Sequence, residues 1–192
     1  YCTNLDNNLV MPFPNDFIIL PFIAAFLGTA ILTPLFIVIN KKLGIIDDPK
    51  RHNHPAIIHT KPIPRGGSLP IFLGVMIAGF MFLPMNSITI PIFLSALLAL
   101  VIGIVDDILN AKGKEISPYL RFATNIVTAL IIVSAGISIG FITNPFAEGF
   151  IHFDPLFDSF LSIIWLVWIM NMLNWSKGVD GQMPGIILVA SF

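Results

Sequence analysis

The sequence predicts an all-α fold, a polytopic transmembrane helix bundle with about five full spans plus the start of a sixth. Of its 192 residues, 56% are apolar and 11% are charged, whereas a soluble domain carries about 25% charge. Several uncharged stretches reach or approach the roughly 20 apolar residues that cross a bilayer as a helix. The basic residues are confined to alternate connections between those stretches. These three observations exclude a chain that covers itself with a water-compatible surface.

The uncharged stretches set the expected order of helices. They are Phe17 to Ile39, Leu69 to Met85, Ile88 to Val105, Phe122 to Ile142 and Ser159 to Trp175, with a sixth that begins near Pro184. We expect one integral-membrane domain over residues 1–192 that continues beyond them. Glycines inside these stretches should permit close packing of helices; they include Gly28, Gly74, Gly79, Gly103 and Gly136.

The distribution of positive charge predicts the orientation. All ten Lys and Arg residues lie between Lys41 and Arg65, between Lys112 and Arg121, or at Lys177. Because cytoplasmic loops are enriched in Lys and Arg, we expect cytoplasmic loops at residues 41–68, 106–119 and 174–183 and an external N-terminus. The net charge of −1 offers no electrostatic argument for a nucleic-acid partner.

Two adjacent aspartates follow the third apolar stretch. Asp106 and Asp107 would repel each other at the edge of a bilayer, so a cation must offset the repulsion or one of them must stay protonated. Acidic residues at this depth indicate function, although the pair could simply mark a helix end. Asn110 follows one helical turn later, with Lys112 and Lys114 beyond it. This combination suits a Mg²⁺–diphosphate, because Mg²⁺ takes carboxylates together with phosphate oxygens.

The first basic loop contains a second group of candidate residues. Its Pro-Ile-Pro run keeps the chain extended, and Gly66 with Gly67 allows a sharp turn into the next span. Lys61 and Arg65 would then lie near the membrane surface, where they suit phosphate groups of a lipid or a substrate. The alternative is that these charges only anchor the loop in the cytoplasm.

The third loop follows the fifth span. Asn171 and Asn174 lie one helical turn apart, and glycines on both sides of Asp180 allow the backbone to bend closely around a ligand. The asparagines could instead form hydrogen bonds between helices. We expect the three loops to converge into one polar pocket, open to a water-soluble donor from the cytoplasm and to a lipid phosphate from the bilayer.

Three motifs occur in order along the chain. They are GIIDDP with HTKPIPRGG in residues 44–67, GIVDD in residues 103–107 and NMLNWSKGVDG in residues 171–181. Together they resemble the motifs of the polyprenyl-phosphate N-acetylhexosamine-1-phosphate transferases, which are of the glycosyltransferase 4 type. This family includes undecaprenyl-phosphate GlcNAc-1-phosphate transferases and phospho-MurNAc-pentapeptide translocases. The resemblance runs from about residue 17 to the end of the chain.

The resemblance implies a reaction and a location. A UDP-N-acetylhexosamine would give its sugar 1-phosphate to polyprenyl (undecaprenyl) phosphate in the cell membrane, releasing UMP on the cytoplasmic face. Mg²⁺, or alternatively Mn²⁺, would be the cofactor, with Asp106 and Asp107 at the metal–diphosphate or the lipid phosphate and one of them a candidate base. The expected substrate-binding residues are Asp48, Lys61, Arg65, Asn110, Lys112, Lys114, Asn171, Asn174, Lys177 and Asp180.

The chain also departs from the family pattern. Lys177 stands where the family has an Asp, which leaves the sugar donor open, and Asn110 stands where some members have a third Asp. The family's later motifs, including a metal-binding Asp, are expected beyond residue 192, so residues 1–192 alone should be inactive. The length of the polyprenol and the oligomeric state also stay open, a homodimer being one alternative.

Two other functions are compatible with a polytopic membrane chain. An intramembrane prenyltransferase would use two Asp-rich motifs, whereas this chain has one. A transporter would place its polar residues near the midplane of the bilayer, whereas here they gather toward one face. An inactive homologue is a third alternative, because of Lys177.

Overall fold

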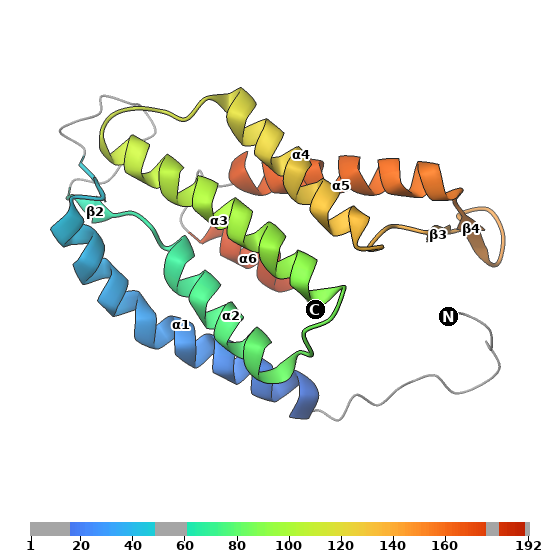
Figure 1. The fold of residues 1–192 in the computed structure, drawn as a ribbon, viewed down its shortest axis with the longest axis horizontal. Helices are drawn as coiled ribbons and strands as arrows, with labels where there is room; N and C mark the ends of the chain where they lie inside the picture. Colours follow the sequence, from blue (N-terminus) through green and yellow to red (C-terminus); the bar gives the residue numbers. More distant parts are fainter. Residues whose placement is uncertain (1–15, 49–60, 176–180, 191–192) are drawn as a thin grey trace.

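In a computed structural model of the chain, residues 16–48, 61–175 and 181–190 are described. Within them, helices predominate and two short antiparallel ribbons join them (Figure 1). The elements are α1 (Asp16–Leu43), β1 (Ile46–Asp47), β2 (Ile63–Pro64), α2 (Ser68–Phe82), α3 (Thr89–Ala111), α4 (Pro118–Ser134), β3 (Phe141–Thr143), β4 (Phe150–His152), α5 (Pro155–Trp175) and α6 (Gln182–Ala190). The predicted helical fold is confirmed, but the two ribbons were not predicted.

Three of the helices are long and apolar enough to cross a membrane: α1 from Ile18, α3 and α5. The helices α2 and α4 are apolar but shorter, with 15 and 17 residues. The predicted span from Phe122 to Ile142 is wrong beyond Ser134, where α4 ends. Gly136 follows with a φ of +82° and donates its N–H to the carbonyl of Val133, a common way to end a helix.

A left-handed glycine also ends α1 and α3. Gly44 has a φ of +71° and Gly113 a φ of +76°. At both ends the glycine N–H bonds the carbonyl three residues earlier, and the next N–H bonds the carbonyl five residues earlier. This pair of bonds is the Schellman motif, which satisfies the last carbonyls of a helix and reverses the chain. At the end of α1 the motif leads directly into β1, and at the end of α3 it leaves Asn110 in the last turn of the helix.

Close approach of α1 and α2 depends on glycine. A Cβ at Gly74 would lie 2.7 Å from a backbone carbonyl oxygen of α1, and a Cβ at Gly28 would lie 3.3 Å from the Cα of Gly74. Gly79 likewise makes room for an aromatic ring of α3. The prediction of close packing is confirmed at these three positions. It is wrong at Gly103 and Gly136, where no described atom lies within 4 Å of an added Cβ.

Small residues occupy the contacts between helices, and large apolar residues face outward. The buried side chains include Ala78, Ser95 and Ala129, whereas Phe22 and Ile31 are 65% and 70% exposed. Tight packing of small residues is typical of helices that associate in a bilayer. An exposed apolar surface of this extent would be unfavourable in water, so it fits the membrane environment that the composition predicts.

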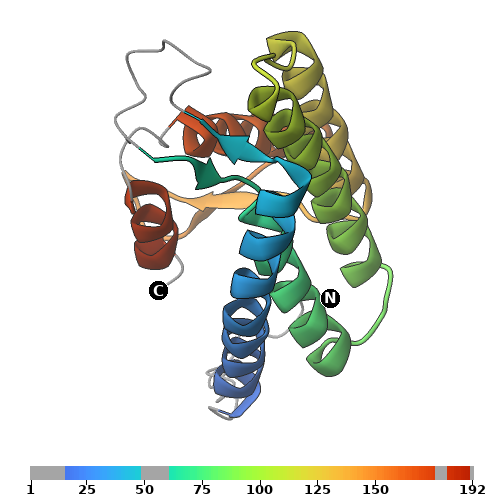
Figure 2. The same ribbon diagram turned by 90° about the vertical axis from the view of Figure 1, so that its left-hand side faces the viewer.

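The connections separate into two ends of the bundle. The C-terminal ends of α1, α3 and α5 lie on the left of Figure 1, together with β1, β2 and the N-terminal ends of α2 and α4. Figure 2 looks at this end and shows β1 and β2 in front of the helices. All the described Lys and Arg residues belong to the elements and loops of this end. The described basic residues therefore share one end, as predicted; that this end is cytoplasmic stays a prediction.

Candidate active site

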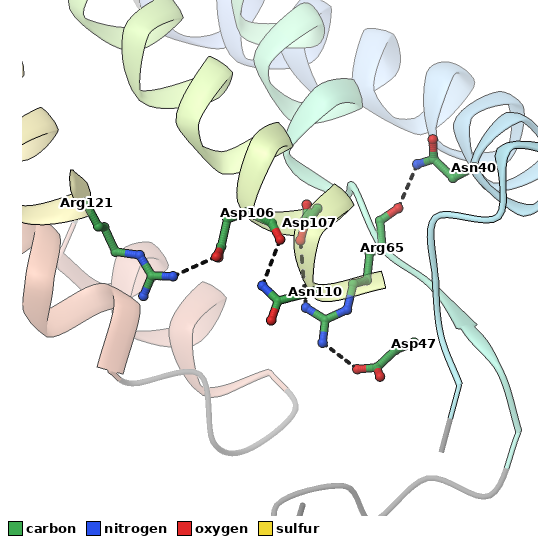
Figure 3. A network of polar contacts seen from close by, with 7 residues as sticks. All are labelled: Asn40, Asp47, Arg65, Asp106, Asp107, Asn110 and Arg121. Atoms are coloured by element: carbon green, nitrogen blue, oxygen red, sulfur yellow. Dashed lines mark hydrogen bonds and ion pairs between the residues drawn. The ribbon is translucent and has the colours of Figure 1, made fainter. Parts of the chain in front are cut away.

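Asp106 and Asp107 lie inside the last turns of α3, which continues to Ala111. The predicted loop 106–119 is therefore wrong at its start, since the helix extends six residues into it. Adjacent residues of an α-helix point about 100° apart. The two carboxylates consequently face different neighbours, Asp106 toward α4 and Asp107 toward the residue after β2 (Figure 3).

Asp106 forms an ion pair with the first turn of α4. The Nη2 of Arg121 lies 2.8 Å from its Oδ1, and the two side chains are 15% (Asp106) and 29% (Arg121) exposed. The short link from Gly113 to Ser117 and the start of α4 at Pro118 bring Arg121 alongside α3. Asn110 lies on the same face as Asp106, as expected, but its side-chain amide donates to the backbone carbonyl of Asp106 at 2.8 Å.

Asp107 faces a second arginine. The Nη1 of Arg65 lies 3.9 Å from its Oδ1, while the Nη2 of Arg65 donates to Oδ2 of Asp47 at 2.6 Å. Asp47 belongs to β1 and Arg65 directly follows β2, so the pairing of the two strands brings these side chains together. The ladder continues past β2, because the N–H of Arg65 donates to the carbonyl of Ile45 at 3.0 Å.

The backbone at Arg65 is held from the side of α1. Asn40 is 3% exposed and donates its side-chain amide to the carbonyl of Arg65 at 2.7 Å. Gly66 follows with a φ of +92°, and a Cβ there would lie 2.6 Å from the amide nitrogen of Asn40. The predicted glycine turn is confirmed, with two reasons for glycine: the left-handed backbone and the contact with Asn40.

Charged side chains of both signs make up the described cluster. It contains three carboxylates, of Asp47, Asp106 and Asp107, and two guanidiniums, of Arg65 and Arg121, so the balance of three negative and two positive charges is −1. From the sequence, we expected a cation from a ligand to offset the repulsion between the two aspartates. In the structure, two arginines of the chain provide positive charge beside them. Arg121 and Asp47 were missed as site residues. The only sequence signal for Arg121 was its position in a basic loop, and the only one for Asp47 was its position next to the predicted Asp48.

Other predicted residues of the first two loops lie apart from these ion pairs. Lys61, Lys112 and Lys114 are exposed and form no ion pair with the described part of the chain. Asp48 is half-buried and directly follows β1. The structure therefore unites Asp106, Asp107, Arg65 and Asn110 but leaves the lysines facing outward.

The predicted residues of the third loop fall in two groups. Asn171 donates its amide to the carbonyl of Val167 in its own helix at 2.7 Å, and Asn174 lies half-buried in the last turn of α5. Lys177 and Asp180 lie outside the described residues. The end of α5 lies at the same end of the bundle as the aspartate pair (Figure 1), so the expected convergence of the third loop stays a prediction.

A metal held jointly with a diphosphate stays a prediction that the number of carboxylates allows. Within the described residues no group of three or more His, Cys, Asp or Glu side chains could hold a metal ion. Mg²⁺, however, usually binds through one or two carboxylates plus substrate phosphates, and Asp106 and Asp107 supply that number. A cavity of about 60 Å³ beside Asn40 and Arg65 is too small for a nucleotide sugar, since ligand pockets hold about 300 Å³ or more.

Comparison with known proteins identifies the family. The model of glycosyl transferase family 4 matches residues 89–192, from the first residue of α3 onward. The chain belongs to glycosyl transferase family 4. The matched family region includes the aspartate pair and Arg121, and the resemblance inferred from the three motifs is confirmed.

Relatives with curated names extend the similarity to the first loop. The chain is 30% identical over 179 residues to a probable undecaprenyl-phosphate N-acetylglucosaminyl 1-phosphate transferase of Bacillus subtilis (strain 168), covering 90% of this chain and 46% of that protein. It is 25% identical over 160 residues to a decaprenyl-phosphate N-acetylglucosaminephosphotransferase of Mycobacterium tuberculosis (strain ATCC 25618 / H37Rv), covering 78% and 37%. A phospho-N-acetylmuramoyl-pentapeptide-transferase of Lactobacillus gasseri is 28% identical over 190 residues, covering 91% and 57%.

The chain thus spans about half the length of the curated relatives that it matches. No solved structure matches it. Together with the three long apolar helices, membership of this family supports the prediction of a membrane protein.

Proposed function

We propose that the complete protein transfers N-acetylhexosamine 1-phosphate from a UDP-sugar to a polyprenyl phosphate and releases UMP. The observation that carries this proposal is the pair of adjacent carboxylates at one end of an apolar bundle, each beside a guanidinium. The names of the relatives, which describe transfers to undecaprenyl or decaprenyl phosphate, support the lipid acceptor.

The reaction exchanges one diphosphate (P–O–P) linkage for another. An oxygen of the lipid phosphate attacks the phosphorus that carries the sugar, a new P–O bond forms, and the bond to UMP breaks with the electron pair leaving on UMP. Such transfers depend on positioning and on stabilisation of negative charge. Arg65 and Arg121 suit this task, because guanidinium groups bind phosphate oxygens in a planar, two-pronged geometry.

The carboxylates have a complementary task. Asp106 and Asp107 would hold Mg²⁺, which supplies neutralisation of charge on diphosphate oxygens when it is bound. Their place at the end of α3, rather than in the middle of the apolar stretch, suits an acceptor that reaches the site from the bilayer. We propose that this end is cytoplasmic, because it holds the basic residues.

The test uses the complete protein in membranes or detergent. UMP release is measured with undecaprenyl phosphate, Mg²⁺ and one donor at a time: UDP-GlcNAc, UDP-GalNAc or UDP-MurNAc-pentapeptide. We expect UMP and a lipid-linked diphosphate sugar in equal amounts with one class of donor, and loss of both products when Mg²⁺ is chelated. UMP release that does not need the lipid, or no release with any donor, would contradict the proposal.

A further inference from the structure

Arg65 contacts its two carboxylates unequally. The Nη2–Oδ2 distance to Asp47 is 2.6 Å, a short charged hydrogen bond, whereas the Nη1–Oδ1 distance to Asp107 is 3.9 Å. A separation of 3.9 Å is too long for a hydrogen bond, so Asp107 attracts the guanidinium without binding it closely. Asp47 is thus the anchor of Arg65, and Asp107 is its looser neighbour.

The guanidinium also has hydrogen-bonding capacity to spare. Its Nε is buried and has no hydrogen-bond partner in the described part of the chain, and the same holds for Oδ1 of Asp47. Buried polar atoms normally have partners. The backbone beneath the side chain is held by Asn40, so a rearrangement would be confined to the side chain.

We propose that Asp47 is a positioning residue that keeps the Arg65 guanidinium out of hydrogen-bonding distance of Asp107, and that Arg65 leaves Asp107 for a phosphate group when substrate binds. The inference rests on the proposed function, because it requires a phosphate-bearing substrate. Arg65 serves as a counter-ion of Asp107 in the free protein. A phosphate offers more negative charge and more acceptor oxygens than one carboxylate, and it matches the planar guanidinium.

This exchange would make binding of the phosphate at Arg65 favour binding of the divalent cation at Asp107. While Arg65 lies near Asp107, its charge opposes a divalent cation at the same carboxylate. When a phosphate draws Arg65 away, this opposing charge leaves Asp107, and the cation that the phosphate also needs binds there more tightly. The phosphate belongs to either the nucleotide sugar or the polyprenyl lipid, and the two sources are separated by experiment.

The experiment measures binding rather than turnover, in the complete protein. Arg65→Gln removes the charge, Arg65→Lys keeps the charge without the planar fork, Asp47→Asn removes the anchor, and Asp47→Glu replaces it conservatively. Lys42→Gln is the matched control, because Lys42 is an exposed cation at the same end of the bundle. Mn²⁺ binding is followed by electron paramagnetic resonance without substrate, and binding of UDP-GlcNAc and of a short-chain polyprenyl phosphate is measured separately.

We expect opposite shifts in Arg65→Gln. Its affinity for Mn²⁺ should rise by about threefold or more, since a competing cation is gone, and its affinity for one phosphate ligand should fall by about tenfold or more, since a charged hydrogen bond is lost. The ligand that is weakened identifies the phosphate. Arg65→Lys should retain the weaker Mn²⁺ binding of the wild type while still losing phosphate affinity.

For the Asp47 variants we expect a different combination of changes in Mn²⁺ and phosphate affinity. Asp47→Asn should weaken both ligands, because the released guanidinium moves onto Asp107 and no longer faces the phosphate, and Asp47→Glu should recover part of the loss. Parallel weakening in Arg65→Gln would show a merely structural role and overturn the inference, as would unchanged binding of Mn²⁺ or of both phosphate ligands. A wild-type protein that transfers sugar phosphate while Arg65→Gln shifts nothing would leave the proposed function intact. Opposite shifts in a protein without transferase activity would support the inference about Arg65 and contradict the proposed function.

Discussion

The two ribbons β1–β2 and β3–β4 have the same antiparallel pairing but differ in what holds them. The β1–β2 ribbon is joined to the helices by charged and polar side chains: Asp47 binds Arg65, Arg65 faces Asp107 of α3, and Asn40 of α1 binds the Arg65 carbonyl. In β3–β4 all six strand residues are exposed, and the ring of Phe141 packs edge-on against that of Phe150 at 5.0 Å.

The difference shows where the fold places its constraints. A two-stranded ribbon is at best marginally stable by itself, so each ribbon needs support from elsewhere. At the end that holds the aspartate pair the support comes from ion pairs that also orient candidate catalytic groups. At the other end of the bundle (Figure 1) it comes from ring contacts and from the backbone N–H of Ile139, which donates to the hydroxyl of Ser162; these contacts include no ion pair.

Thiol labelling tests whether the two ends lie on opposite sides of the membrane. Glu115, in the link between α3 and α4, and Glu148, between β3 and β4, are both exposed. With Cys2 replaced, Glu148→Cys should react with an impermeant thiol reagent in intact cells, whereas Glu115→Cys should react only after permeabilisation. Equal reaction at both positions in intact cells would remove the proposed orientation.

Removal of either carboxylate should have the largest effect on turnover. In the complete protein Asp106→Asn and Asp107→Asn should each lower the transfer rate by on the order of a hundredfold or more, because each loses charge at the metal–diphosphate. UMP release under saturating donor measures the effect, and Glu148→Gln is the control at the other ribbon. Near-normal rates in both aspartate variants would exclude the pair from the mechanism.

A pair of glycine substitutions compares the ribbons directly. Gly66 and Gly149 have φ values of +92° and +113°, but an added Cβ meets Asn40 at the first and no described atom within 4 Å at the second. Gly149→Ala should cost about 1–2 kcal/mol of stability through backbone strain alone and leave transfer unchanged. Gly66→Ala should cost more and lower transfer by on the order of tenfold, because it displaces Arg65.

Thermal unfolding in detergent together with UMP release measures both variants. If Gly149→Ala reduced transfer as strongly as Gly66→Ala, the two ribbons would not differ in the way that their contacts indicate.

The smallest effect is expected at the tip of the β3–β4 connection. Phe146 is 95% exposed, so Phe146→Ser removes little packing within the chain and should leave the transfer rate unchanged within about twofold. The rate at saturating substrate is the measurement. A large loss would show that this end of the bundle also contributes to the reaction.

Sequence reasoning succeeded where a local rule decides the outcome. The apolar stretches located all the described helices, the spacing of Asp106 and Asn110 predicted their shared face, and Gly66 predicted a turn. It failed at residues 135–142, because apolar composition alone does not show that Gly136 adopts a left-handed conformation and ends α4. It also missed Arg121 and Asp47, whose partners lie 15 and 18 residues away in the chain.

By itself, the sequence determined the helical membrane class, the family and the aspartate pair, because composition, the length of apolar stretches and motif order are properties of the chain alone. Only the tertiary structure decided which cation faces which carboxylate. That choice depends on the divergence of Asp106 and Asp107 around α3, and on the packing of α4 and β2 against its two sides. Ion pairs need side chains within about 4 Å of each other, and distances between residues far apart in sequence are set by how the helices pack.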